Sequence, residues 1–361
     1  MPSPAAADAP VAAADDHPLV SATLLIADQL RARAALLESD GVTREDTGAL
    51  AAIGLYAVGA PATHGGVPGP VARRVAEILA GASPDAWFVW FQHGPVLKML
   101  AHSDNAALAA RWLAPLASGH AQAGVAYSHL RTAQPSITAT RASGGGWSLT
   151  GSQPWCTGWG LIDVVLVGAV TEKGPDQQVV FALVPVDVQH LPTGIRSTGE
   201  LALAAMGGTS THSISFESLA VPDEDVVAVR SFAEWAEADR IATPNLLPST
   251  VGLTAAATAL LAARDPAAAD RLRRRGDALR DEAYALIDDV AASEQTARRL
   301  ALRAEAMLLS TEAAGAALAA RGGQGMDLAN PEQRLLRAAA FQLVHAQTGP
   351  VKAATLQQVA R

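Results

Sequence analysis

The amino-acid sequence predicts an α+β fold in which a strand-rich middle segment lies between two helical segments. From Gly124 to Val226, short runs rich in Val, Ile and Thr are separated by Gly, Pro and Ser turns. An antiparallel barrel or sandwich requires this spacing. On both sides of that segment, apolar residues recur at helical spacing, and the composition is rich in Ala and Leu, which favour helix.

The N-terminal segment is predicted to be helical. Apolar residues at helical spacing predict a first helix over Leu19–Leu37. A second helix is predicted over Arg44–Ile53, because Thr43 and Asp46 have the spacing of a capping box. The remaining helices are predicted over Pro70–Ala80, Asp85–Leu100 with a bend at Gly94–Pro95, and Ala106–Leu116.

The middle segment is predicted to hold six strands. A Val-rich apolar run from Asp163 to Gly168 indicates a buried strand. The predicted strands are Val125–Ser128, Ile137–Ala142, Trp147–Thr150, Val164–Ala169, Gln178–Pro185 and Thr211–Val221.

The C-terminal segment is predicted to be a four-helix bundle. Leu246–Ala263 has no charged residue, and a helix that is apolar nearly all round is expected inside a bundle. The other three helices are predicted over Pro266–Ala292, Glu294–Leu318 and Pro331–Val344. The predicted domains are therefore 17–120, 121–227 and 228–361, after a disordered tail at 1–16 that is rich in Ala, Pro and Asp.

Composition excludes several classes of function. The formal net charge is −8 and no basic stripe stands out, so nucleic acid is not expected as a partner. Cys156 is the only cysteine, which excludes an intrachain disulfide and agrees with a reducing cytoplasm. The longest uncharged run, Ile241–Ala263, contains Pro, Asn, Ser and Thr and is a poor membrane span. The histidines are scattered, so no metal site is expected.

One motif in the middle segment carries most of the functional information. Residues 146–158 read Gly-Trp-x-Leu-x-Gly-x-x-x-Trp-x-Thr-Gly, which places Trp155 two residues before Thr157. A flat indole beside a hydroxyl suits the wall of a site for a planar heterocycle, although both residues also suit an ordinary core. The whole motif resembles the middle-domain signature of the acyl-CoA dehydrogenase family.

The resemblance extends over nearly the whole chain and implies a fold. Pro61–Gly66 is similar to the family's Pro-x-x-x-Gly-Gly turn, and Phe216–Asp223 is similar to its exit strand. The implied fold has an N-terminal helical domain, a middle β-barrel or sandwich domain, and a C-terminal four-helix bundle.

The resemblance also implies a cofactor and an assembly. Trp155 and Thr157 match the family's flavin-contacting Trp and Thr, and Gly322, Gly323 and Gly325 match its Gly-Gly-x-Gly loop. In the family this loop approaches the FAD of a neighbouring subunit. The expected cofactor is therefore FAD, and the expected assembly is a homodimer, a homotetramer or a heteromer with a homologue.

Aromatic residues indicate a substrate pocket. Trp87 and Trp90 lie on a helix that faces the substrate side in the family, and His93 follows them. With Trp159 they would form an aromatic wall with a polar tip. Core packing between helices explains the same residues.

Two departures from the family pattern concern the cofactor. Where the family has a segment rich in Gly and acidic residues that contacts flavin and pyrophosphate, Tyr127–Pro135 has neither. The family's Arg-x-x-Phe-Gly motif, which holds FAD from the partner subunit, is also missing; Arg264 or one of Arg273–Arg275 can substitute for it.

The third departure concerns the catalytic base. In the family a carboxylate removes the α-proton of an acyl thioester while the β-hydride passes to the flavin. The matching position here is Ala346, and the family's other placement falls near Ala242 or Thr243. The remaining candidates are Asp239, Glu237 and His345, which surface or packing roles also explain.

Three functions follow from the resemblance. The first is an oxidoreductase of acyl-CoA dehydrogenase type that acts on an acyl thioester or a related small molecule with a non-standard base. The second is a flavin-dependent monooxygenase on the same fold, which needs no base for an α-proton. The third is a non-catalytic subunit that pairs with an active homologue.

Overall fold

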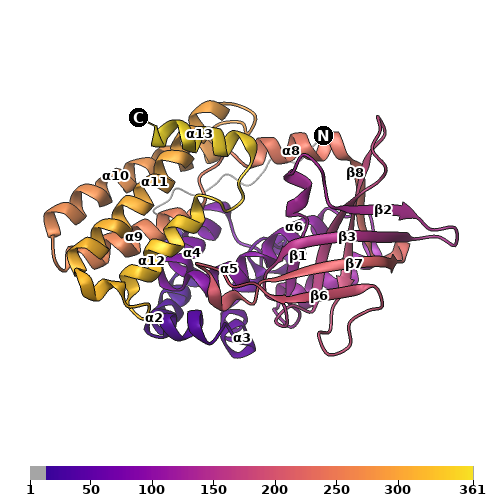
Figure 1. Ribbon diagram of the computed structural model, residues 1–361, viewed down its shortest axis with the longest axis horizontal. Coiled ribbons are helices and arrows are strands. Elements are labelled where there is room, and N and C mark those ends of the chain that lie inside the picture. Colours follow the sequence, from indigo (N-terminus) through magenta and orange to yellow (C-terminus); the bar gives the residue numbers. More distant parts are fainter. Residues whose placement is uncertain (1–13, 361) are drawn as a thin grey trace. The chain divides into compact units, whose positions relative to one another are not determined.

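The computed structural model describes residues 14–360, which form two compact units (Figure 1). The helical unit comprises residues 14–35, 67–84 and 244–360, and the sheet unit comprises residues 36–66 and 85–243. The predicted division into three domains stays a prediction. Residues 1–13 of the predicted tail lie outside the described residues. Of the rest of that tail, Ala14 is buried, and Asp15 Oδ1 accepts a hydrogen bond from Arg74 Nε at 2.6 Å.

The helical unit is built around α9 (Pro248–Ala262), which packs against α4, α10, α11 and α12. One side of α9 is buried because Gly252 lets its backbone lie directly against the backbone of Glu77 on α4. The other helices of this unit are α2 (Pro18–Ser39, whose last turn enters the sheet unit), α4 (Gly69–Ala82), α10 (Pro266–Asp289), α11 (Thr296–Arg321), α12 (Pro331–Gln342) and α13 (Gly349–Val359).

The helices of the sheet unit follow the predicted order. The capping box at Thr43 is confirmed: its hydroxyl accepts from Asp46 N, and the Asp46 carboxylate accepts from Thr43 N. The predicted bend at Gly94–Pro95 is a break at Gln92, which places Pro95 in the first turn of a new helix, where its missing N–H leaves no bond unmade. The helices are α3 (Arg44–Ala52), α5 (Pro84–Phe91), α6 (His93–Ala101), α7 (Ala106–Ala117) and α8 (Phe232–Ala242).

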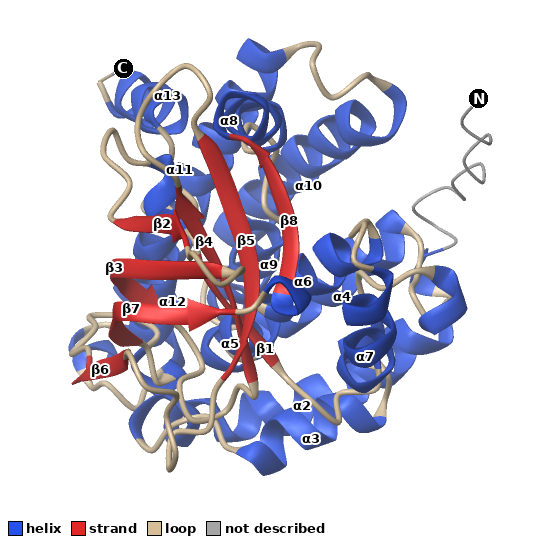
Figure 2. Ribbon diagram, turned by 90° about the vertical axis from the view of Figure 1, so that its right-hand side faces the viewer, coloured by secondary structure: helices blue, strands red, loops and turns tan. Residues whose placement is uncertain are grey.

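Within the described residues, eight strands form one sheet, in the order β6-β7-β3-β2-β4-β5-β8, with β1 parallel to β4. The ladder between β2 and β4 consists of one residue pair, Thr138 and Val170. In Figure 2, β3 and β7 cross the view while β4, β5 and β8 run steeply, so the sheet turns a corner at this junction. The strands are β1 (Ala123–Ala126), β2 (Ile137–Arg141), β3 (Trp147–Cys156), β4 (Val164–Val170), β5 (Gln178–Pro185), β6 (Ile195–Glu200), β7 (His212–Val221) and β8 (Val226–Ser231).

Strand β4 is buried on both faces, as its Val-rich sequence predicts. Val165 and Val167 belong to a cluster of buried side chains that comes mainly from the strands, here called the interior of the folded sheet. Val164 and Leu166 pack with residues of α6 and α7. Successive side chains of a strand point to opposite faces, so one strand supports both cores. The α+β class predicted from the sequence is confirmed. Within residues 14–360, no helix combines the length and apolar character that a bilayer crossing requires.

Candidate functional site

The predicted flavin-contacting pair lies at the end of β3 in the sheet unit. Trp155 is 52% exposed, although Trp87, Trp90 and Trp159 are buried. The strand ends at Cys156, and Gly158 (φ +81°) turns the chain. Thr157 therefore lies beyond the strand and is buried. Residues two apart on a strand share a face, but these two residues do not, because only Trp155 is in the strand.

The Thr157 hydroxyl belongs to a chain of three buried threonines. Thr157 Oγ1 lies 3.0 Å from Thr211 Oγ1, and Thr211 Oγ1 lies 2.8 Å from Thr209 Oγ1. Thr209 Oγ1 donates a hydrogen bond of 2.7 Å to the Met206 carbonyl. Thr209 and Thr211 are not predicted as site residues by the sequence. The register of β3 with β7, which pairs Cys156 with His212, brings them to Thr157.

The turn that carries Thr209 is tightly packed within the sheet unit. Gly208 N donates to Asp85 Oδ1 at 2.9 Å, and a side chain at Gly208 would collide with the Leu37 carbonyl. Met206 and Ser210, on either side of the turn, have φ of +61° and +44°. Residues other than glycine adopt this backbone conformation only where the surroundings hold them there.

Cys156 lies between the two candidate flavin residues and is fully buried. Burial raises the pKa of its thiol to about 12, because the thiolate has no solvation there. The thiol is consequently protonated at neutral pH, which disfavours a nucleophilic role.

The segment Tyr127–Pro135, which departs from the family pattern, has its own internal contacts. His129 Nε2 donates to the Gly168 carbonyl at 2.8 Å, and its Nδ1 accepts from Ser136 N at 3.1 Å. Arg131 binds the carboxylate of Asp239 through two bonds, Nε to Oδ2 at 2.9 Å and Nη2 to Oδ1 at 2.7 Å. Asp239, a candidate base, is thus half of a bidentate ion pair.

The glycine loop lies in the helical unit, at the end of α11. Gly322 (φ +74°) ends the helix, and its N–H bonds to the carbonyls of Leu318 and Ala319. The space beside Gly322 and Gly323 is open, whereas Leu318 and Arg321 fill the space beside Gly325. Two of the three glycines therefore have room for a ligand to approach their backbone.

The position that matches the family's base lies on a turn after α12. Ala346 has φ +48°, and residues 343–348 contain no carboxylate. Arg303, which is buried, donates through Nη2 to the carbonyls of His345 at 2.9 Å and Ala346 at 3.3 Å. The ring of His345 stacks on Phe341 with centroids 5.1 Å apart.

The predicted aromatic pocket residues are buried in the sheet unit. Trp90 Nε1 donates to the Leu55 carbonyl at 3.0 Å, and Trp159 belongs to the interior of the folded sheet. His93 Nε2 donates to the Leu116 carbonyl at 3.1 Å, while Nδ1 accepts from Ala123 N at 3.0 Å. Burial lowers the pKa of His93 to about 4. These contacts give both ring nitrogens of His93 a structural role, and the pocket role of the aromatic residues stays a prediction.

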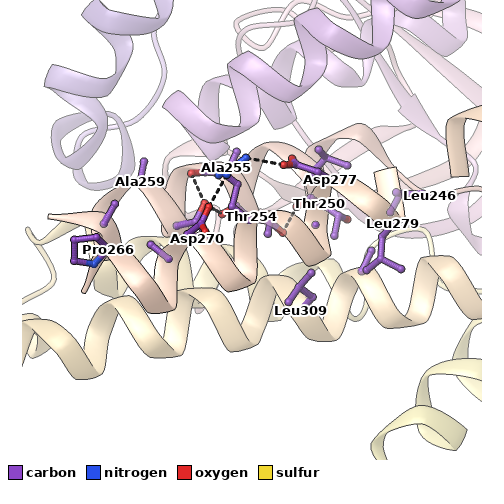
Figure 3. Close-up of a pocket in the computed structure, with 17 residues that line it drawn as sticks. Leu246, Thr250, Thr254, Ala255, Ala259, Pro266, Asp270, Asp277, Leu279 and Leu309 are labelled. Atoms are coloured by element: carbon purple, nitrogen blue, oxygen red, sulfur yellow. Dashed lines mark hydrogen bonds and ion pairs between the residues drawn. The ribbon is translucent and has the colours of Figure 1, made fainter. Parts of the chain in front are cut away.

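The helical unit contains a groove of about 330 Å³ between α9, α10 and α11, which the sequence analysis did not anticipate (Figure 3). Small side chains on α9 face it, and the hydroxyls of Thr254 and Thr258 bond to carbonyls of their own helix at 2.8 and 3.0 Å. At its rim Arg273 bridges Asp270 at 2.6 Å and Asp277 at 3.0 Å.

A second hollow in the helical unit, of about 670 Å³, has a buried carboxylate in its wall. Glu77 Oε1 accepts from Arg280 Nε at 2.8 Å and from the Tyr284 hydroxyl at 2.7 Å. Arg74 also pairs with Glu77, at 3.2 Å, so this charge is neutralised within the unit. Among residues 14–360 no group of three His, Cys, Asp or Glu side chains could hold a metal ion.

By sequence, the chain matches no protein-family model and no curated protein. By structure, it matches butyryl-CoA dehydrogenase from Megasphaera elsdenii with a TM-score of 0.79 and 15% identity, over 99% of this chain and 100% of that one. Dibenzothiophene monooxygenase from Paenibacillus sp. A11-2 matches with a TM-score of 0.77 and 18% identity, over 95% and 97%. Nitrososynthase from Micromonospora carbonacea var. africana matches with a TM-score of 0.75 and 19% identity, over 99% and 98%.

The chain therefore has the fold of the acyl-CoA dehydrogenases along nearly its whole length, as the motif resemblance predicted. The three matched proteins carry different activities in their names, so the shared fold does not select one of them. Any choice among them rests on the residues of this chain.

Proposed function

We propose that this protein is a flavin-dependent oxidoreductase that uses reduced flavin and molecular oxygen to oxygenate a small molecule. The bound reduced flavin would supply two electrons, so that one oxygen atom enters the substrate and the other leaves as water. The resemblance to the acyl-CoA dehydrogenase signature at residues 146–158 and the shared fold support a flavin as the cofactor.

The candidate residues fit a flavin in their chemistry. Trp155 exposes half of its surface at the end of β3, so an aromatic face is available to a planar ring. The space beside Gly322 and Gly323 is open, so a phosphate group can approach the backbone at Gly323, while the Gly322 N–H already bonds within α11. Because Tyr127–Pro135 lacks the glycines and acidic residues of the family's pyrophosphate segment, the mononucleotide FMN is tested beside the expected FAD.

The lack of a carboxylate at Ala346 is the observation that favours oxygenation over desaturation. Removal of an α-proton requires a base within reach of the substrate. Asp239 is bound through both of its oxygens by Arg131, and His345 stacks on Phe341. Oxygen activation by reduced flavin needs no such base. Desaturation with Asp239 or His345 as the base, and a non-catalytic subunit, are the alternatives.

The proposal is tested by flavin binding and reoxidation. The purified chain is titrated with FAD and FMN, oxidised and reduced, under anaerobic conditions, and flavin absorbance and protein fluorescence are recorded. We expect a flavin complex whose oxidised form butyryl-CoA does not bleach and whose reduced form reacts with oxygen. Bleaching by the thioester would instead establish a dehydrogenase, and a chain that binds neither flavin would be the non-catalytic subunit.

Substitutions at the end of β3 test the site itself. Trp155→Ala is expected to weaken binding of both redox states by about tenfold through lost stacking. Thr157→Val is expected to weaken binding of reduced flavin by about tenfold through a lost hydrogen bond. Trp147→Ala is the matched control, because it also removes an indole from β3. Trp147 lies at the opposite end of that strand, where its ring packs under the Arg141 guanidinium. Equal losses in the three variants would contradict the site assignment.

Assembly and localisation also remain proposals. The homo-oligomer or heteromer implied by the family resemblance is tested by sedimentation of the purified chain. A cytoplasmic location is tested by fractionation of the source cells.

A further inference from the structure

We propose that Thr209 and Thr211 orient the Thr157 hydroxyl as a hydrogen-bond acceptor toward its ligand, so that the site binds reduced flavin more tightly than oxidised flavin. This inference rests on the proposed function, since it takes a flavin as the ligand beside Trp155 and Thr157. It assigns Thr209 and Thr211 as positioning residues that act through Thr157.

The direction of each hydroxyl proton follows from the Met206 carbonyl, at which the series of hydrogen-bonded threonines ends. The Met206 carbonyl can only accept, so Thr209 must donate its single proton to it. Thr209 Oγ1 then accepts from Thr211, whose only proton is used in that bond. Thr211 Oγ1 in turn accepts from Thr157. The Thr157 proton therefore points into the protein, and only lone pairs of its oxygen remain for a ligand.

Burial and backbone contacts hold this chain of bonds in place. Thr157, Thr209 and Thr211 are all buried, so water does not compete for their hydroxyls. Two further bonds join the segments that carry them: Gly158 N donates to the Thr209 carbonyl at 2.9 Å, and Trp159 N donates to the Ser210 carbonyl at 2.9 Å. The hydroxyl polarity is thus fixed before any ligand binds.

This polarity distinguishes the two redox states of a flavin. The oxidised isoalloxazine ring has several acceptor atoms and one N–H that both redox states share. Reduction turns an acceptor nitrogen of the central ring into an N–H donor, and we place this nitrogen against Thr157. An acceptor hydroxyl pairs with an N–H, whereas facing a second acceptor in a dry site leaves both groups without a bond. The arrangement therefore stabilises bound reduced flavin relative to bound oxidised flavin and raises the midpoint potential on binding.

The experiment measures the ratio of dissociation constants for oxidised and reduced flavin, by anaerobic titration with FMN and FAD. For the unmodified protein this ratio is expected to exceed one. Thr211→Val frees the Thr157 proton to face the ligand, so the ratio is expected to fall about tenfold, the size of one hydrogen bond. Thr211→Ser keeps the hydroxyl and is expected to restore the ratio.

Thr138→Val is the matched control, because Thr138 is exposed and its hydroxyl bonds to the Thr150 carbonyl of the neighbouring strand. If Thr211→Val does not fold, Thr209→Val tests the same relay, because Thr211 is then released to donate to Thr157. An unmodified protein that binds both redox states equally, or a folded Thr211→Val protein with an unchanged ratio, overturns the inference and leaves flavin binding standing. A chain that binds neither redox state overturns the proposed function and this inference together.

Discussion

At the scale of single residues, the structure separates side chains that the motif at residues 146–158 groups together. Trp155 is exposed, Cys156 is buried and Thr157 bonds to Thr211. The sequence predicted the pair of Trp155 and Thr157 as a unit. It could not reveal the hydroxyl chain, because Thr211 is 54 residues away and reaches Thr157 only through the register of two strands.

Cys156 offers a direct test of how closely the end of β3 is packed. Its thiol is buried and its pKa is raised to about 12, so the native protein should not react with a thiol reagent at pH 8. We expect labelling to appear only as urea unfolds the chain, with the labelled fraction following the unfolding curve. Labelling of the native protein at the rate of a free cysteine would show that this region opens, and Cys156→Ser supplies the unlabelled baseline.

His93 predicts how stability depends on pH. Its pKa in the folded protein is about 4, against 6.5 in the unfolded chain. Below pH 6.5 the unfolded chain takes up a proton that the folded protein does not, so the free energy of unfolding falls as the pH drops to about 4. The full loss is about 3 kcal/mol. Burial also lowers the pKa of His129, which adds a loss of the same sign.

Urea unfolding at several pH values measures this effect. His93→Gln removes one titrating group while keeping an amide that can hydrogen-bond, so the variant should be less stable at pH 7 and lose less stability toward pH 4. A variant with the same pH slope as the unmodified protein would show that His93 does not titrate as inferred.

At the scale of helices and strands, glycine positions decide how closely helices approach. A Cβ at Gly252 would collide with the backbone of Glu77, where α9 crosses α4, whereas a Cβ at Gly315, within α11, meets nothing. Gly252→Ala should therefore destabilise the protein by about 3 kcal/mol through overpacking. Gly315→Ala should stabilise it by up to about 1 kcal/mol, because alanine favours helix.

Thermal unfolding of the two variants measures this difference. The same substitution in two helices gives opposite signs only if helix contact, and not helix propensity, dominates at Gly252. Loss of stability in both variants would contradict this account.

Elements were predicted well where apolar periodicity is strong and missed where it is weak. Most helices and the buried strand β4 follow their predicted ranges closely. Strand β6 was missed, because only Ile195 of its six residues is buried, as was β8, which lies at the other edge of the sheet. Helix α13 was missed because Leu356 and Val359 are exposed, so its apolar residues form no single stripe. Edge elements owe their structure to pairing and packing partners more than to their own pattern.

At the scale of the whole molecule, segments that are far apart in the sequence pack into the same unit. The helical unit takes residues 14–35 and 67–84 from the first part of the chain and residues 244–360 from the last. The sequence predicted the fold class from consecutive segments. It could not show that α4 packs on α9, since nothing local to α4 encodes a partner some 180 residues further along.

This organisation predicts that the C-terminal segment does not fold alone. In a fragment of residues 244–361, α9 would expose the face that packs on α4, and Arg280 and Tyr284 would lose Glu77. We expect the fragment to unfold without a cooperative transition in urea, measured by far-ultraviolet circular dichroism, and to gain one when it is co-expressed with residues 1–84. A sharp transition in the fragment alone would contradict the packing described for α9.

Arg303 Nη2 holds the turn at Ala346 by donating to two main-chain oxygens. These two bonds therefore do not depend on which side chain residue 346 carries. A substitution at this position would leave both acceptors of Arg303 in place, so the chemistry of the side chain and the anchoring of the turn are set by different atoms.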